Sequence, residues 1–126
     1  MSTKTVVITG STRGLGLEMA KQFRGNGCNV VVCGSSRNID NALQELAKIE
    51  NEAGLLGLPC NVSKLSEVEA LAAAAVEKFG KIDIWINNAV VNQSHKYAWE
   101  VDDGEIDNLF AVDLKGAVNG SNVAMR

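Results

Sequence analysis

The chain has 126 residues, of which 46% are hydrophobic and 21% are charged, and its formal net charge is −3. This length fits one domain that is large enough to bury a core, with the composition of a soluble globular protein. Basic residues stand singly or beside acidic ones, so the sequence predicts no surface for nucleic acid or acidic lipid. No apolar run is long enough to cross a membrane.

Strand and helix patterns alternate from the start of the chain. The β-branched run 4–9 predicts a strand, and 14–25 predicts a helix that Gly25 ends. A second strand is expected over 28–33, apolar on both faces as a covered parallel sheet requires. Three apolar residues are expected to share one face of the first helix: Leu15, Met19 and Phe23.

The middle of the chain continues this alternation. An amphipathic pattern predicts a helix over 38–53, followed by a strand over 54–60. A further helix is expected over 67–79, opened by a capping box at Ser66, with Ser63 as the competing cap. Three residues of the 38–53 helix are expected to point inward: Leu43, Leu46 and Ile49.

The last third of the pattern begins at Gly80, which ends the preceding helix. A strand over 82–86 leads into a polar loop over 87–102, and a final helix begins near Asp103. This helix is expected to carry an apolar row: Ile106, Leu109, Phe110, Leu114, Val118 and Met125.

These elements predict a single α/β domain over 1–126. The fold is a doubly wound, Rossmann-type parallel sheet with strand order 3-2-1-4 if the crossovers are right-handed. In this order the strand 82–86 is an uncovered apolar edge, and the final helix reaches Arg126 without a capping signal. We therefore expect the chain to be truncated, with a naturally short protein as the alternative.

The turn between the first strand and the first helix carries three glycines, at positions 10, 14 and 16. Glycines in this place let the chain turn sharply, approach a pyrophosphate and pack a helix on the sheet, and the helix N-terminus then faces the phosphates. The alternative is a tight turn without a ligand. The residues predicted to line the pyrophosphate are Gly10, Arg13, Gly14, Leu15 and Gly16.

The spacing Thr-Gly-x-x-x-Gly-x-Gly over 9–16 resembles the glycine motif of the short-chain dehydrogenase/reductase family. Asn61-Val62 resembles its Asp-Val, 87–89 the start of its Asn-Asn-Ala-Gly, and 112–116 its Val-Asn-Leu-Lys-Gly. The resemblance covers the whole chain, but only the first half of a family member. It implies hydride transfer between a nicotinamide cofactor and an alcohol or carbonyl.

The resemblance also implies which residues meet the cofactor. Asn61 and Val62 are expected to contact adenine, and Asn88 and Ala89 the ribose side. Three residues differ from the family pattern: Asn61 replaces an aspartate, Val90 a glycine and Asp113 an asparagine.

The segment 33–37, Cys-Gly-Ser-Ser-Arg, decides between the two nicotinamide cofactors. An NAD site usually presents a carboxylate there to the ribose hydroxyl, but the first acid is Asp40, in the next helix. Serines and an arginine suit a 2′-phosphate instead. We therefore predict that Ser35, Ser36 and Arg37, helped by Arg13, bind NADP, with NAD as the alternative.

The catalytic groups that the resemblance implies are a tyrosine and, four residues later, a lysine. Tyr97 is the only tyrosine, but Val101 stands four residues after it, so Tyr97 is assigned a loop or packing role. His95 is interpreted as a solvated loop residue. Asp113 occupies the position of the family's catalytic asparagine, which supports a water-linked proton path, and is therefore the candidate catalytic residue, although an ionised aspartate cannot donate a hydrogen bond.

Three functional hypotheses remain open: a fragment of an NADP-dependent oxidoreductase, a non-catalytic NADP-binding module, and a folded product without function. Under each of them we expect a homo-oligomer, because the apolar face of the final helix needs a cover.

The odd count of cysteines (Cys28, Cys33 and Cys60) has no metal-like spacing, so they are interpreted as buried reduced thiols, over a disulfide or a metal site. The first strand begins close to Met1, which leaves no room for a signal peptide. The expected compartment is the cytoplasm.

Overall fold

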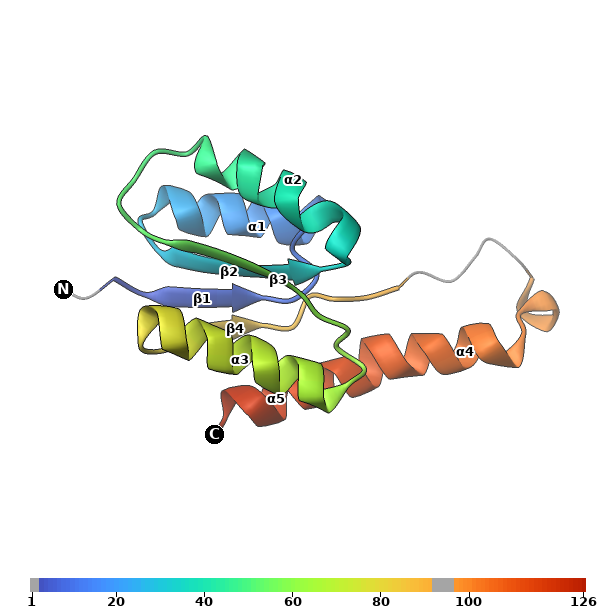
Figure 1. The fold of residues 1–126 in the computed structure, drawn as a ribbon. Coiled ribbons are helices and arrows are strands. Elements are labelled where there is room, and N and C mark those ends of the chain that lie inside the picture. Colours follow the sequence, from blue (N-terminus) through green and yellow to red (C-terminus); the bar gives the residue numbers. More distant parts are fainter. Residues whose placement is uncertain (1–2, 92–96) are drawn as a thin grey trace.

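The computed structural model describes residues 3–91 and 97–126. Four strands form one parallel sheet in the order β3-β2-β1-β4, with helices on both faces (Figure 1). The predicted fold class and strand order are therefore confirmed. The strands are β1 (Thr5–Ile8), β2 (Asn29–Gly34), β3 (Leu55–Pro59) and β4 (Ile84–Ile86).

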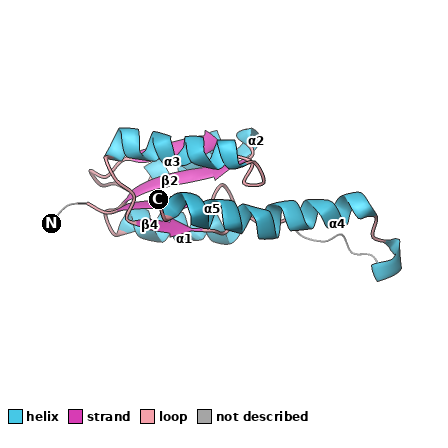
Figure 2. Cartoon of the chain, turned by 90° about the horizontal axis from the view of Figure 1, so that it is seen from below, coloured by secondary structure: helices cyan, strands magenta, loops and turns pink. Residues whose placement is uncertain are grey.

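Helices connect the strands and cover the sheet. α1 and α2 lie on one face and α3 and α5 on the other, while α4 and the π-helical turn η2 extend α5 beyond the sheet (Figures 1 and 2). The helices are α1 (Gly14–Gly25), α2 (Ser36–Ala47), α3 (Leu65–Phe79), α4 (Asp103–Leu109) and α5 (Gly116–Ala124). The turns are η1 (Ala98–Glu100) and η2 (Phe110–Lys115).

The core has two halves, because β1 and β2 bury side chains on both faces of the sheet. On one face Val6 and Ile8 pack with Ala20 of α1 and Leu46 of α2. On the other face the side chains of β1 and β2 pack under α3. The buried residues of that second cluster are Val7, Val31, Cys33, Leu71 and Ala75.

Helix α2 differs most from its prediction, since it begins two residues earlier than 38 and ends at Ala47. Ser35 is extended, with φ −70° and ψ 146°, and stands at the N-cap position. After the helix, Asn51 Oδ1 accepts a hydrogen bond from the Ala53 N–H at 3.0 Å, and its Nδ2 donates to Arg24 O. Such side-chain bonds give the backbone an alternative to the helix, so the segment 50–53 leaves it.

The predicted capping box of α3 is wrong. The helix begins at Leu65 with Lys64 at the N-cap, and the described side chain there makes no capping bond. Ser63 Oγ instead donates to Asn61 Oδ1 at 2.6 Å, and Glu67 Oε1 accepts from the Asn61 N–H at 3.0 Å. Glu67, in the first turn of α3, therefore binds the backbone of the loop before the helix.

Other boundaries shift by one or two residues, as strand ends commonly do. β4 begins at Ile84 rather than at 82. The predicted end of α3 is confirmed: Gly80 follows it with φ 83°, in the left-handed region. Leu15 is the exception to the predicted face of α1, because it is 70% exposed while Met19 and Phe23 pack on the core.

Candidate functional site

The carboxyl ends of β1 and β4 are tied together by one hydroxyl. Thr9 Oγ1 accepts hydrogen bonds from the backbone N–H groups of Asn88 at 2.9 Å and Ala89 at 3.1 Å. Thr9 is only 2% exposed. A buried acceptor that serves two backbone donors fixes the loop after β4 against the glycine turn.

A second buried hydroxyl ties the turn to β2. Ser11 Oγ donates to Ile8 O at 2.6 Å and accepts from the Cys33 N–H at 3.1 Å, while the Ser11 N–H donates to Cys33 O at 2.9 Å. Neither Thr9 nor Ser11 was predicted as a site residue. The available signal was a hydroxyl residue on each side of Gly10.

Two of the three glycines are required by close contacts. Gly10 has φ 64°, and a Cβ there would lie 2.7 Å from Ala89 Cα. A Cβ on Gly16 would overlap Gly10 O and lie 2.6 Å from Asn88 Nδ2. Gly14 has open space around it but has φ 58°, a conformation that favours glycine. The turn therefore depends on glycine for two separate reasons.

The start of α1 is open on its outer side. Arg13 occupies the N-cap position with φ −160° and ψ 171°, and its described side chain makes no capping bond. Arg13, Gly14 and Leu15 are exposed, whereas Gly16 is buried against the sheet. The first N–H groups of a helix have no partner within it, so they and the positive dipole end face an accessible surface.

The turn from β2 to α2 forms the neighbouring part of this edge. The side chain of Thr12 packs against Gly34, where a Cβ would lie 2.6 Å from Thr12 Oγ1. Ser35, Ser36 and Arg37 follow at the exposed start of α2. The sheet order thus brings the two predicted phosphate-binding segments to adjacent strand ends.

Asn61 and Val62, after β3, have different surroundings. Asn61 is exposed, and its Oδ1 accepts from both the backbone and the hydroxyl of Ser63. Val62 is only 5% exposed, and a Cβ on Gly116 would meet its Cγ2 at 2.5 Å. The buried Asn119 donates to Val62 O at 2.9 Å, a bond with no signal in the sequence.

The two asparagines after β4 face different partners. Asn88 Nδ2 donates to Gly10 O at 3.0 Å and so belongs to the glycine turn. Asn87 Oδ1 accepts from Trp85 Nε1 at 2.9 Å, and its Nδ2 donates to Ser121 Oγ at 3.1 Å. Asn87 therefore ties β4 to α5, and Asn88 lies at the site.

Asp113 also acts on the loop after β4. It lies in the π-helical turn η2, and its Oδ1 accepts from the Val91 N–H at 2.8 Å. π-helical turns within helices are frequent at functional sites. The carboxylate uses only its accepting capacity here, so this bond does not need the donor that an asparagine has.

The aromatic residues of the η1 region are exposed. Tyr97 and Trp99 are 66% and 80% exposed, and their rings stack with centroids 4.7 Å apart and planes 3° apart. The predicted loop position of Tyr97 agrees with this arrangement. His95 lies outside the described residues.

All three cysteines are free. The thiols of Cys33 and Cys60 hydrogen-bond to each other. This bond, together with burial, raises the pKa of the Cys60 thiol far above its ordinary value. It lowers the pKa of Cys33, and the Gly10 N–H adds to that effect against the opposing effect of burial. The pair therefore ionises first at Cys33.

Among the described residues there is neither a cluster of metal-ligating side chains nor a membrane-spanning helix. In 3–91 and 97–126, no three His, Cys, Asp or Glu side chains are grouped so that they could hold a metal ion. No helix in the same part of the chain is both long and apolar enough to cross a membrane.

The comparison with protein families assigns the chain. The family described as short chain dehydrogenase matches residues 4–126, and the chain belongs to this family. A similar curated relative is a probable chloroplastic chlorophyll(ide) b reductase from Arabidopsis thaliana, 34% identical over 97% of this chain and 28% of that protein. The chain thus spans less than a third of that relative.

Solved structures agree with the family assignment. A variant of the actinorhodin polyketide ketoreductase, solved with NADPH, has a TM-score of 0.90 and 28% identity, with 98% of this chain and 47% of that chain covered. A short chain dehydrogenase/reductase from Burkholderia phymatum, solved with NAD, has a TM-score of 0.89 and 29% identity, with 97% and 43% covered.

Proposed function

We propose that this chain is the cofactor-binding half of an NADP-dependent oxidoreductase that passes hydride between nicotinamide and an alcohol or carbonyl. The observation that carries the proposal is the turn 10–16. Its glycines and its buried hydroxyls hold an open helix N-terminus at the meeting point of β1, β2 and β4. A dinucleotide binds at such a switch point in doubly wound sheets.

The cofactor lies along the carboxyl edge in this proposal. Its pyrophosphate faces the residues of the glycine turn, and its adenosine lies between the start of α2 and the loop after β3. Asn88 and Ala89 border the nicotinamide ribose, while Asp113 positions that loop through Val91. When bound, the nicotinamide supplies or accepts the hydride.

We propose NADP rather than NAD because of the charged residues near the turn. Arg37 and Arg13 are exposed cations beside the turn, and residues 33–37 carry no acid that would repel a 2′-phosphate. Replacing Arg37 by Ala should weaken NADPH binding about tenfold, the effect of losing a charge-assisted hydrogen bond, and leave NADH binding unchanged. Fluorescence titration with both cofactors measures this. An equal loss for both cofactors would contradict the assignment of Arg37.

Turnover is proposed to need residues beyond those of this chain. Val101 stands four residues after Tyr97, where the family pattern has a lysine. The purified chain should therefore bind NADPH without oxidising it, which the absorbance of NADPH measures in the presence of carbonyl compounds. Steady oxidation would refute this. The lack of a lysine four residues after Tyr97 also supports the second candidate, a non-catalytic NADP-binding module, over a complete enzyme.

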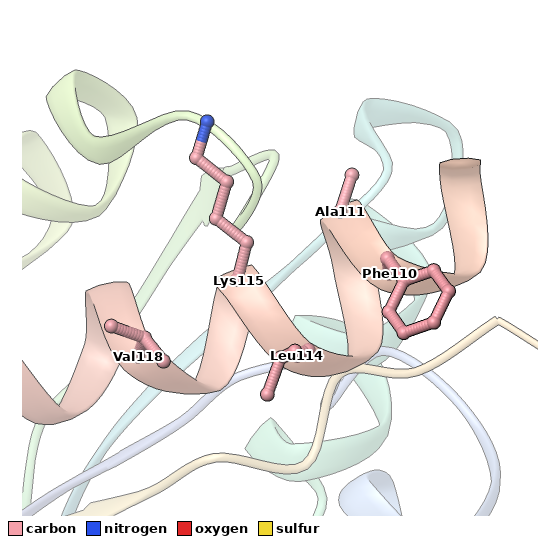
Figure 3. Close-up of a pocket in the computed structure, with 5 residues that line it drawn as sticks. All are labelled: Phe110, Ala111, Leu114, Lys115 and Val118. Atoms are coloured by element: carbon pink, nitrogen blue, oxygen red, sulfur yellow. The ribbon is translucent and has the colours of Figure 1, made fainter.

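A homo-oligomer is proposed from the outer face of the arm formed by α4, η2 and α5. Its side chains border an apolar hollow of about 390 Å³ (Figure 3). Phe110 is 61% exposed and Leu114 58% exposed. Large exposed apolar patches mark interaction sites. The mass of the chain by light scattering tests this proposal, and a monomer at micromolar concentration would contradict it.

The cytoplasm is proposed as the compartment on the ground of the free thiols. Fractionation of cells that express the tagged chain tests this, and recovery from an organelle fraction would contradict it.

A further inference from the structure

Two of the three cysteines lie together at the carboxyl edge of the sheet. Cys33 of β2 pairs in register with Leu58 of β3, and Cys60 follows two residues later. Alternate residues of a strand point to the same face, so Cys33 and Cys60 share one face of the sheet. The Cys60 N–H also donates to Gly34 O at 3.2 Å, which continues the pairing of β2 and β3 to Cys60.

The side chains of both residues pack in the cluster under α3, where their thiols form a hydrogen bond. Their accessibility differs, because Cys33 is fully buried and Cys60 is half-buried. A small oxidant can therefore reach Cys60, with Cys33 directly behind it as the second thiol.

Each cysteine precedes one segment of the proposed cofactor site. Cys33 is followed by Gly34 and the serines and arginine of 35–37, and Cys60 by Asn61 and Val62. A covalent link between them would change the spacing of the two segments between which the adenosine is proposed to lie.

We infer that Cys33 and Cys60 form a reversible oxidation site, in which a disulfide across the ends of β2 and β3 weakens dinucleotide binding. The effect on binding rests on the proposed function; the formation of the disulfide does not. Bonded sulfurs lie about 2 Å apart, closer than hydrogen-bonded thiols, so the link draws the two segments together.

The oxidant is a hydroperoxide, here hydrogen peroxide. The Cys60 sulfur attacks one peroxide oxygen while its proton passes to the Cys33 thiolate; a sulfenic acid forms on Cys60, hydroxide is released, and this hydroxide takes the proton from Cys33 to give water. Cys33 then attacks the Cys60 sulfur as a thiolate, the S–S bond forms, the S–O bond breaks, and a second hydroxide leaves. The two thiols lose two electrons and two protons, and the peroxide is reduced to two waters. Because the Cys60 thiol is held protonated, the first step is slow and the reaction needs excess peroxide.

The test treats the folded chain with excess hydrogen peroxide and maps its disulfides by peptide mass spectrometry. We expect a Cys33–Cys60 link within one chain, with Cys28 left free, and reversal by dithiothreitol. Cys28→Ser is the matched control, since Cys28 is also half-buried but precedes β2 at the opposite edge of the sheet. This variant should form the same link, whereas Cys60→Ser should form none.

Binding is measured on the same samples with NADPH. The oxidised chain should bind at least threefold more weakly than the reduced chain, and Cys60→Ser should be insensitive to peroxide. Unlinked cysteines after treatment, or links through Cys28 or between chains, would overturn the inference. A mapped Cys33–Cys60 link with unchanged NADPH affinity would refute the proposed effect of the disulfide on dinucleotide binding. A reduced chain that binds no NADPH would instead refute the proposed function, while the disulfide map still decides the oxidation site.

Discussion

The glycine turn after β1 and the arm formed by α4, η2 and α5 differ in the kind of chemical group that they expose. At the turn, the buried hydroxyls of Thr9 and Ser11 bind backbone groups of three strand ends, and the exposed groups are the N–H donors of a helix start. Along the arm, the exposed groups are apolar side chains such as Phe110 and Leu114. We therefore propose that the turn binds a small anionic ligand and that the arm contacts a protein surface.

The two regions also differ in how closely their residues must pack for the chain to fold. The turn depends on contacts that leave no space for one additional carbon atom, as at Gly16. The arm should tolerate change on its outer face, because side chains there such as Phe110 and Leu114 are more than half exposed. Substitutions in the two regions should thus differ in their effect on the free energy of unfolding.

The largest effect is expected at Gly16. Gly16→Ala places a Cβ against Gly10 O and Asn88 Nδ2, which are themselves held by hydrogen bonds. We expect the free energy of unfolding to fall by about 3 kcal/mol and NADPH binding to be lost. Gly25→Ala is the control, since no heavy atom lies within 4 Å of its added Cβ. Urea unfolding followed by tryptophan fluorescence measures the stability of both variants, and titration with NADPH measures their binding. Equal stability of the two variants would show that the turn is not tightly packed.

A smaller effect is expected at Thr9. Thr9→Val keeps the shape of the side chain but leaves the N–H groups of Asn88 and Ala89 without their acceptor. The free energy of unfolding should fall by about 2 kcal/mol, the cost of unpaired polar groups that are partly buried. Thr3→Val, at an exposed position, should change it little. If Thr9→Val matched this control, the hydroxyl would not tie β4 to the turn.

At the opposite edge of the sheet, Asp83 predicts a dependence on pH. The Thr5 N–H, at 2.7 Å from Asp83 Oδ2, and Lys81 hold the pKa of this carboxyl below its ordinary value. A lowered folded-state pKa contributes stability that is present above the unfolded-state pKa and is lost as the pH falls through the folded value. Asp83→Asn should therefore be less stable than the parent at pH 7, and this difference should shrink as the pH falls through the lowered pKa of Asp83. Chemical unfolding at several pH values measures the difference. A difference that does not change as the pH falls would assign it to packing.

The smallest effect on stability is expected on the arm. Leu114→Glu changes a side chain that is 58% exposed, so the free energy of unfolding should change by no more than about 0.5 kcal/mol. The same change should lower the oligomeric mass in light scattering, because a charge in an apolar interface is costly. Asn122→Glu, also exposed on α5, serves as the control and should leave the mass unchanged. A loss of stability without a change in mass would place Leu114 in the fold of one chain.

The fold could be predicted from the sequence wherever local signals and the period of the pattern agreed. Helix α1 has its predicted bounds, since glycines stand at both ends. Helix α2 was predicted too long, because the side-chain bonds of Asn51 are made to Arg24 and Ala53 and no periodicity reports them. The turn η2 was not predicted either, because a π-helical turn changes the backbone hydrogen bonds without a distinct pattern in the sequence.

The candidate site could be predicted less completely. Glycine spacing located the turn, but the residues that hold it, Thr9 and Ser11, act through contacts with strand ends more than 20 residues away in sequence. Val62 shows the same limit, since its burial depends on Gly116 and Asn119 of a helix whose position only the fold defines. Motifs identified the region, and long-range contacts determined the role of each residue.

Calorimetric titration of the chain with NADPH, and in parallel with NADH, tests the central claim most directly. The open helix start above Gly16 and the cations at Arg13 and Arg37 predict saturable binding at one site, tighter for NADPH than for NADH. Gly16→Ala should abolish the heat of binding, and Gly25→Ala should retain it. Absence of binding by the folded parent chain with either cofactor would contradict the assignment of the 10–16 turn as a dinucleotide site.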